Sequence, residues 1–113
     1  MVSRYVPSAG DLVWMDFDPQ AGREQAKRRP ALVLTDQTYN RASGLAVVCP
    51  LTSKRKPYPF AFAAAVDKVE GAVLADHLKS VDWTARRAAF YSKADPALLK
   101  SVRTYIAVLL GIR

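Results

Sequence analysis

The chain has 113 residues, half of them hydrophobic, so it is long enough to form one domain, residues 1–113, around one core. Lysine and arginine outnumber aspartate and glutamate by 17 to 10, and the net charge of +7 favours a polyanionic partner, either nucleic acid or an acidic protein. The single cysteine, Cys49, and the single histidine, His77, exclude an intrachain disulfide, a cysteine-rich zinc site and catalysis by a histidine pair. No apolar run is long enough for a membrane span and the N-terminus does not read as a secretory signal, so we expect a cytoplasmic protein.

The first half of the chain predicts three strands, over residues 12–18, 31–35 and 45–52, because apolar, branched and aromatic residues cluster there between turn residues. Residues 19–29 are polar and basic and contain Gly22, which indicates a loop, and residues 39–44 are interpreted as a connection. Pro50 lies inside the third strand and predicts a sheet edge or a bulge at that point.

The second half predicts a basic loop over 53–59, then short strands over 60–66, 71–76 and 80–83, followed by a polar stretch that begins at Arg86 and Arg87. The alanines of 60–66 also suit a helix, but turn residues lie close on both sides, which favours a strand.

The clearest helix of the chain is at its end. Asp95 is a suitable N-cap, Pro96 suits the first helical position and Gly111 suits the stop, although Ser92 and Asp95 together also fit a capping box that begins one turn earlier. Apolar residues recur every three or four positions and predict one face that packs on a sheet: Leu98, Leu99, Val102, Tyr105, Ile106, Leu109 and Leu110. The pattern as a whole predicts a mainly β fold, a small antiparallel barrel or curled sheet closed by a C-terminal helix.

Two loops hold many of the cationic residues. The first contains Arg23, Lys27, Arg28 and Arg29, and the second contains Lys54, Arg55 and Lys56. If the strands that follow these loops pair, the two loops form one basic groove for nucleic acid. The alternative is a pair of solvated loops whose charges serve solubility.

Three residues in or beside these loops have side chains suited to cleaving a phosphodiester. Glu24 is the only acid among the cations of the first loop, which should lower its pKa and keep it ready as a general base. Arg29 immediately precedes a buried strand, and its guanidinium can bind a phosphate through two hydrogen bonds. Thr52 ends a strand just before the second loop and offers a hydroxyl donor. A salt-bridged Glu24 and a Thr52 that is only a good strand former remain the structural alternatives.

Other residues are weaker candidates. Four aromatic residues could stack on bases, and Tyr58 is the best placed, between two prolines beside the second loop: Trp14, Phe17, Tyr58 and Trp83. His77 could carry protons but is more often structural, and Cys49 reads as an inert core thiol.

In these residues the sequence resembles the MazF/PemK family of toxin endoribonucleases from type II toxin–antitoxin systems. The resemblance covers nearly the whole chain and rests on Gly10 to Trp14, Asp16 to Pro19, Gly22, Glu24-Gln25, Arg29 to Leu34, Pro50-Leu51-Thr52, Lys56 to Phe60, Gly71, Leu74 to Asp76, Lys79 to Val81 and Trp83. It implies an SH3-like barrel that works as a homodimer, a cognate antitoxin with an acidic disordered tail, and metal-independent, sequence-specific cleavage of single-stranded RNA without a cofactor.

The resemblance also implies roles for individual residues. Arg29 and Thr52 are the expected catalytic pair, with Glu24 as a further catalytic residue. The expected RNA-binding residues are Phe17, Asp18, Pro19, Gln20, Gly22, Arg23, Gln25, Lys27, Arg28, Ser53, Lys54, Lys56, Tyr58 and His77. Lys27 stands where the family often has glycine and His77 where it often has glutamine, so the recognised RNA sequence does not carry over.

Two other functions stay open. Gyrase-poisoning toxins share this fold and cut nothing, although this chain lacks the Trp-Gly-Ile ending that we associate with them. A non-catalytic nucleic-acid-binding barrel would explain the basic loops and the aromatics equally well, but it would gain nothing from a negative charge at Glu24.

Overall fold

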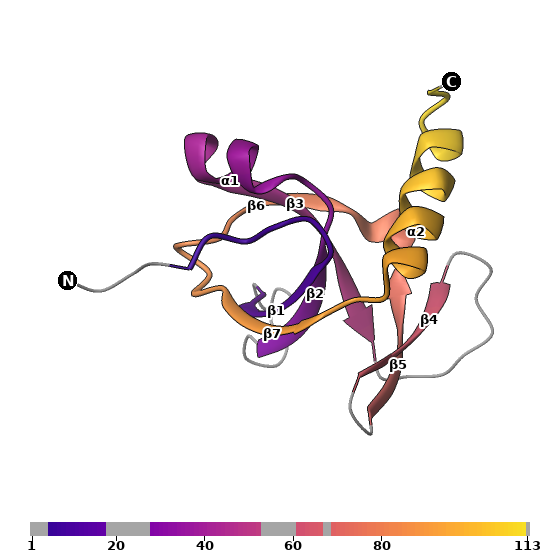
Figure 1. Ribbon diagram of the computed structural model, residues 1–113, viewed down its shortest axis with the longest axis horizontal. Helices are drawn as coiled ribbons and strands as arrows, with labels where there is room; N and C mark the ends of the chain where they lie inside the picture. Colours follow the sequence, from indigo (N-terminus) through magenta and orange to yellow (C-terminus); the bar gives the residue numbers. More distant parts are fainter. Residues whose placement is uncertain (1–4, 18–27, 53–60, 67–68, 113) are drawn as a thin grey trace, which may run out of the picture.

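The computed structural model describes residues 5–17, 28–52, 61–66 and 69–112 (Figure 1). In chain order its elements are β1 Asp11–Asp16, β2 Arg28–Val33, α1 Gln37–Ser43, β3 Leu45–Thr52, β4 Ala61–Val66, β5 Val69–Leu74, the short 3-10 helix η1 Ala75–His77, β6 Lys79–Asp82, β7 Ala89–Lys93 and α2 Pro96–Leu109. The strands form one sheet in the order β4-β5-β3-β2-β1-β7, and β6 pairs with β3 beside this row. Every pairing is antiparallel, which confirms the predicted curled antiparallel sheet with a C-terminal helix.

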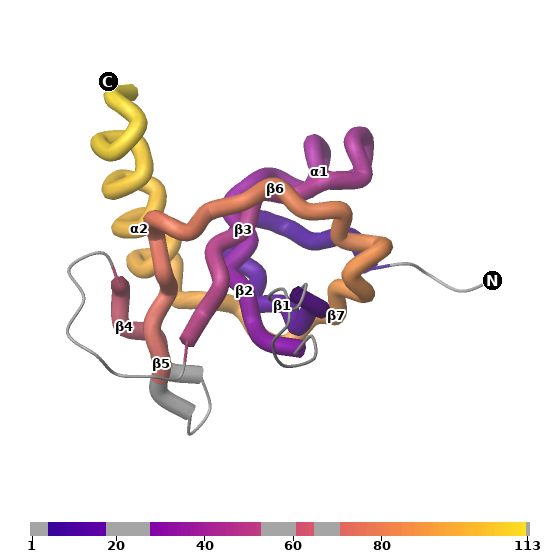
Figure 2. Tube along the Cα trace, turned by 180° about the vertical axis from the view of Figure 1, so that it is seen from behind, coloured from indigo at the N-terminus to yellow at the C-terminus, as the bar shows by residue number. Residues whose placement is uncertain are grey.

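The central strands are buried on both faces, because the sheet curls and is also covered by a helix. One face of the central strands points to the inside of the curl. β6 runs beside β3 and pairs with it (Figure 2). We call the buried residues of this face the inner core: Val13, Met15, Ala31, Val33, Ala46, Val48 and Val81. Residues of β1 and β2 that alternate with these point to the other face.

The other face packs against α2. We call its buried residues the helix-side core: Leu12, Leu32, Leu34, Cys49, Leu51, Ala64, Val73, Ala75, Val102 and Ile106. Because both faces of β2 and β3 are covered, their sequences are continuously apolar instead of alternating, as the sequence predicted for 31–35.

The predicted boundaries of α2 are nearly right. Asp95 is the N-cap, its carboxylate accepting a hydrogen bond from the Ala97 amide at 2.9 Å, and Pro96 occupies the first turn. The predicted apolar face is too long, however, because Leu109 and Leu110 are exposed. The last turn of α2 projects beyond the sheet (Figure 1), so there is no strand beneath it for these leucines to cover.

Pro50 lies where β3 changes partners. On one side Pro50 faces Ala31 of β2, while on the other side β3 pairs with β6 up to Val48 and with β5 from Leu51. A proline has no amide hydrogen to donate, and here it falls in the interval between two partner strands. The predicted irregularity at Pro50 is therefore present, inside the sheet and not at its outer edge.

Two elements were not predicted. Residues 37–43 form α1, where the sequence predicted a connection over 39–44. Residues 89–93 form β7, where the sequence predicted only a short polar stretch after Arg86 and Arg87. Among the described residues, neither helix has the length and apolar character needed to cross a membrane.

Candidate functional site

Several strand termini meet at one edge of the sheet. β1 runs toward this edge and ends at Asp16, β2 starts there at Arg28 opposite Asp16, and β3 runs back to it and ends at Thr52. We call it the loop edge, because the chain segments 18–27 and 53–60 are attached there. The sequence hypothesis required β2 and β4, the strands that follow the two loops, to pair. That is wrong, since β5 and β3 lie between them; the loops share an edge because β3, which precedes the second loop, pairs with β2.

Arg29 and Thr52 lie at matching ends of β2 and β3, two residues beyond their paired stretch. The described register matches Ala31 with Pro50 and Leu32 with Cys49. Continued by two residues toward the loop edge, the same antiparallel register aligns Arg29 with Thr52. Directly opposed residues of an antiparallel pair carry their side chains on the same face, roughly 5 Å apart at the β-carbons. The continued register therefore puts Arg29 and Thr52 on the same face at the loop edge, although they are distant in the sequence.

Phe17 lies beneath two cations of this surface. Its ring packs against the inner core, with the Arg29 guanidinium carbon 6.0 Å and the Lys79 ammonium nitrogen 5.5 Å from the ring centroid. Both distances suit a cation–π interaction, which restrains long side chains that would otherwise be mobile. Phe17 therefore supports the two cations as well as presenting an aromatic surface at the edge.

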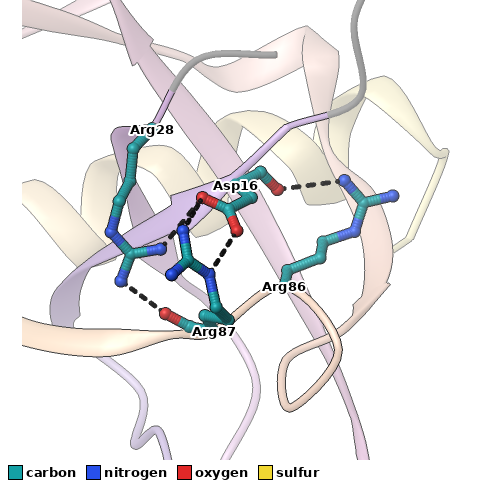
Figure 3. Close-up of polar contacts among 4 residues, drawn as sticks. All are labelled: Asp16, Arg28, Arg86 and Arg87. Carbon is teal, nitrogen blue, oxygen red and sulfur yellow. Dashed lines mark hydrogen bonds and ion pairs between the residues drawn. The ribbon is translucent and has the colours of Figure 1, made fainter.

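A second group of cations surrounds Asp16 on the opposite face of the same hairpin (Figure 3). Arg28 donates to Asp16 Oδ1 at 3.1 Å, and Arg87 donates to both carboxylate oxygens at 2.7 and 3.2 Å. Arg86 donates to the Asp16 main-chain carbonyl at 3.2 Å. The hydrogen bond from Arg87 is the largest cause that lowers the pKa of Asp16. Desolvation, the next largest, opposes the shift, and the hydrogen bond from Arg28 adds to the lowering; the bond with Asp16 raises the pKa of Arg87.

The remaining predicted site residues have different outcomes. Twelve of them lie outside the described residues: Asp18, Pro19, Gln20, Gly22, Arg23, Glu24, Gln25, Lys27, Ser53, Lys54, Lys56 and Tyr58. His77 ends η1, half-exposed, with its Nε2 3.7 Å from Asp76 Oδ1. It comes two residues before Lys79, which contacts Phe17.

The structure gives three weaker candidates a structural role. Trp83 packs against the inner core and donates its indole hydrogen to the Asn40 carbonyl at 3.0 Å. Trp14 packs against Tyr91 of β7, with ring centroids 5.0 Å apart. Cys49 is fully buried, and burial raises the pKa of its thiol to about 12, so it is the inert core thiol that the sequence predicted.

Sequence reasoning did not select Lys79, Arg86 and Arg87 as site residues. Lys79 reaches the edge because β6 pairs with β3, and the two arginines reach it from the turn before β7. The only signal in the sequence was their charge, which says nothing about their spatial neighbours.

Comparison with known proteins identifies the family. Residues 8–110 match the family model described as PemK-like, MazF-like toxin of type II toxin-antitoxin system. The chain belongs to this family. The match covers all the described strands and both helices, including the loop edge.

Individual relatives match over most or all of the chain. The endoribonuclease toxin MazF of Escherichia coli (strain K12) is 44% identical over 111 residues, 98% of this chain and 100% of the relative. Endoribonuclease PemK of Escherichia coli is 30% identical, covering 89% of this chain and 80% of the relative. A chain in the crystal structure of MazE-MazF from Deinococcus radiodurans is 49% identical and superposes with a TM-score of 0.89, covering 97% of this chain and 100% of that one.

Proposed function

We propose that this chain is the endoribonuclease toxin of a toxin–antitoxin pair, cleaving single-stranded RNA at a short specific sequence independently of the ribosome. The observation that carries the proposal is the β2–β3 register in a PemK/MazF fold, which aligns Arg29 with Thr52 when it is continued by two residues to the loop edge. The full-length likeness to the Escherichia coli endoribonuclease toxin MazF supports it. Because its substrate is cellular RNA, we propose the cytoplasm as the site of action.

The chemistry needs few protein groups, because RNA carries its own nucleophile in the 2′-hydroxyl. We assign Glu24 as the general base that removes the 2′-hydroxyl proton while the oxygen attacks the adjacent phosphorus. Arg29 stabilises the extra negative charge on the pentacoordinate phosphorus, and Thr52 donates a hydrogen bond to a phosphoryl oxygen. The bond from phosphorus to the 5′-oxygen breaks and that oxygen takes a proton, for which Arg29 is a candidate donor. The products are a 2′,3′-cyclic phosphate and a 5′-hydroxyl.

RNA binding is assigned to the loop edge and to the two segments attached to it. Phe17 offers a ring on which a base can stack, while Arg28 and His77 border the same region. The other RNA-binding residues proposed from the sequence belong to segments 18–27 and 53–60. Arg29 and Lys79 above Phe17 supply the positive charge that holds a phosphate near that base.

We propose that the chain acts as a homodimer and is inhibited by a cognate antitoxin with an acidic disordered tail. The MazE-MazF crystal structure from Deinococcus radiodurans, in which a matching chain is present, supports an antitoxin partner. A net charge of +7 favours capture of an acidic peptide at the surface that binds RNA.

The deciding experiment is incubation of the purified protein with a long defined RNA in EDTA, with every new 5′ end mapped. We expect cuts at one short recurring motif, with cyclic phosphate and 5′-hydroxyl ends. Arg29→Ala, purified in the same way, should cut at least about a hundredfold more slowly. An Arg29→Ala protein that cuts within threefold of wild type would remove Arg29 from the mechanism.

The same experiment separates the two alternative functions. A gyrase poison would leave RNA of every sequence intact while inhibiting DNA supercoiling. A non-catalytic binding barrel would leave RNA intact and bind it equally well after Glu24→Ala.

A further inference from the structure

Arg87 has an unfavourable backbone conformation. Its φ of 54° makes it the one residue other than glycine in the left-handed region within the segments that the structure describes. A β-carbon is disfavoured there, and residues held in such conformations tend to cluster at functional sites. At this position glycine would satisfy the backbone better, so the reason for an arginine must lie in its side chain.

The side chain and the carbonyl of Arg87 organise the cations around Asp16 (Figure 3). The guanidinium donates to both oxygens of Asp16, at 2.7 and 3.2 Å, and the carbonyl accepts a hydrogen bond from Arg28 at 2.5 Å. Arg28 is in turn bonded to Asp16. Asp16 and the Arg87 carbonyl therefore hold the Arg28 guanidinium at two points.

The group carries more positive than negative charge. Arg28 and Arg87 both donate to the Asp16 carboxylate, so two cations share one carboxylate, and Arg86 donates to the main-chain carbonyl of the same residue. The hydrogen bonds that lower the pKa of Asp16 keep it ionised, but one carboxylate bound by two guanidiniums leaves a surplus of one positive charge. The side chains of Arg28 and Arg87 are 33% and 71% exposed, so an anion can approach them from solvent.

The location of the group fits a strand of RNA. Arg28 and Arg29 are consecutive in β2, so their side chains leave opposite faces of the β1–β2 hairpin at its loop edge. A strand that binds at Arg29 and passes over that edge would present a neighbouring phosphate to Arg28 and Arg87.

We propose that Arg28 and Arg87, held around Asp16, form a second phosphate-binding site that takes a backbone phosphate flanking the one that is cleaved. The proposal deepens the proposed function and rests on its assignment of RNA as the substrate. Contacts of this kind bind phosphate and not base edges, so the site adds affinity and strand direction and leaves the recognised sequence unchanged.

The test uses Arg87→Gly, because glycine accepts a φ of 54° and removes only the side chain. The probe is a fluorescently labelled 2′-O-methyl RNA oligonucleotide, which lacks the nucleophile and is not cut. Its affinity is measured by anisotropy across a range of KCl concentrations. Loss of one phosphate contact on a single strand should reduce the slope of log affinity against log salt by about 0.7. Affinity should weaken severalfold on two unrelated sequences alike. The Tm should change little, because the relieved backbone strain offsets the lost hydrogen bonds to Asp16.

Two further variants serve as controls. Arg87→Lys keeps the charge and should keep most of the slope. Arg41→Gln, in the last turn of α1, removes one exposed positive charge away from the loop edge and should change the slope much less. An unchanged slope in Arg87→Gly, a loss confined to one RNA sequence, or no salt-dependent binding by the wild-type protein would each overturn the proposal.

The cleavage assay in EDTA distinguishes this proposal from the proposed function. A wild-type protein that cuts no RNA, combined with the expected change of slope in Arg87→Gly, would remove the enzymatic function and leave the phosphate site. A wild-type protein that cuts RNA, combined with an unchanged slope in Arg87→Gly, would keep the enzymatic function and remove the phosphate site.

Discussion

At the scale of single residues, the hydroxyl of Thr52 can be tested separately from its role in the strand. Thr52→Val keeps a β-branched side chain at the end of β3 and removes the hydroxyl. Because a hydrogen bond to a charged phosphoryl oxygen contributes about 1.5–3 kcal/mol, we expect cleavage to slow by about tenfold or more. The free energy of unfolding should change by no more than about 1 kcal/mol, measured by urea denaturation.

Thr52→Ser is the matched control, since it restores the hydroxyl and loses the methyl group. It should recover most of the cleavage rate. If the Thr52→Val protein cleaves RNA as fast as wild type does, Thr52 has only a structural role.

Asp16 predicts a pH dependence of stability whose sign follows from its neighbours. The hydrogen bonds from Arg87 and Arg28 lower its pKa in the folded protein below the ordinary value of 3.8. The stabilisation is therefore fully present above the unfolded pKa and is lost as the pH falls through the lower folded value. Asp16→Asn lacks this titration. The excess of the wild-type free energy of unfolding over that of the variant should therefore shrink below about pH 4. Urea denaturation of both proteins between pH 3 and 7 measures this difference in the free energy of unfolding. A difference that stays constant over the whole range would contradict the lowered pKa of Asp16.

The residues of the site differ in how far the sequence could reveal them. Arg29 and Thr52 were candidates because each borders a clear strand beside a basic loop, but only the family resemblance selected them as a pair; the β2–β3 register, continued by two residues, aligns them. Lys79 and Arg87 could not be found, because their positions at the loop edge depend on pairings between distant strands and on one left-handed turn. Local sequence patterns record neither.

At the scale of elements, α2 is the part of the fold whose stability is easiest to test. Ile106 is buried in the helix-side core, whereas Val108, two residues later, is 72% exposed. Ile106→Ala removes buried methyl groups and leaves a cavity, so it should lower the free energy of unfolding by about 2–5 kcal/mol. Val108→Ala removes an apolar side chain from the same helix and should change it by less than about 0.5 kcal/mol. Equal losses of the free energy of unfolding in the two variants would mean that Ile106 is not on the buried face of α2 that the structure describes.

The elements that the sequence predicted are those whose own residues show a clear apolar pattern, either a continuous run or a helical repeat. The strands over 31–35 and 45–52 are continuously apolar, and α2 repeats apolar residues every three or four positions. α1 has no such pattern, because it is held by polar contacts of one buried residue. Asn40 donates to the carbonyls of Pro7 and Thr35, each at 2.9 Å, and its own carbonyl accepts from Trp83.

β7 was not predicted, for a related reason. Its residues are mostly exposed, and its strand conformation comes from pairing with β1, along a register that shifts between Leu12 and Val13. The buried carboxylate of Asp11 in β1 is bound by Lys93 of β7 at 2.6 Å, which fixes the far end of the pair. Such an edge strand is specified by its partner, and its own sequence carries little signal.

At the scale of the whole molecule, the stabilising core and the reactive edge are separate. The helix-side core lies between α2 and the sheet, while Arg29, Thr52 and the arginines around Asp16 lie where the strands end. This arrangement lets the exposed site carry a surplus of positive charge and a strained residue, because neither is needed to cover the core. Variants at the loop edge should therefore change RNA binding and cleavage much more than global stability.

Cys49 provides a direct measure of that separation. Its thiol is fully buried in the helix-side core, 3.7 Å from the Ala75 carbonyl oxygen, and burial raises its pKa to about 12. Iodoacetamide attacks the exposed thiolate, so labelling at pH 8 requires the core to open. If opening is global, Ile106→Ala should accelerate labelling by at least about thirtyfold, in proportion to its loss of stability. Thr52→Val should label within a few-fold of wild type. Labelling as fast as in the urea-unfolded protein would show that this core opens without global unfolding.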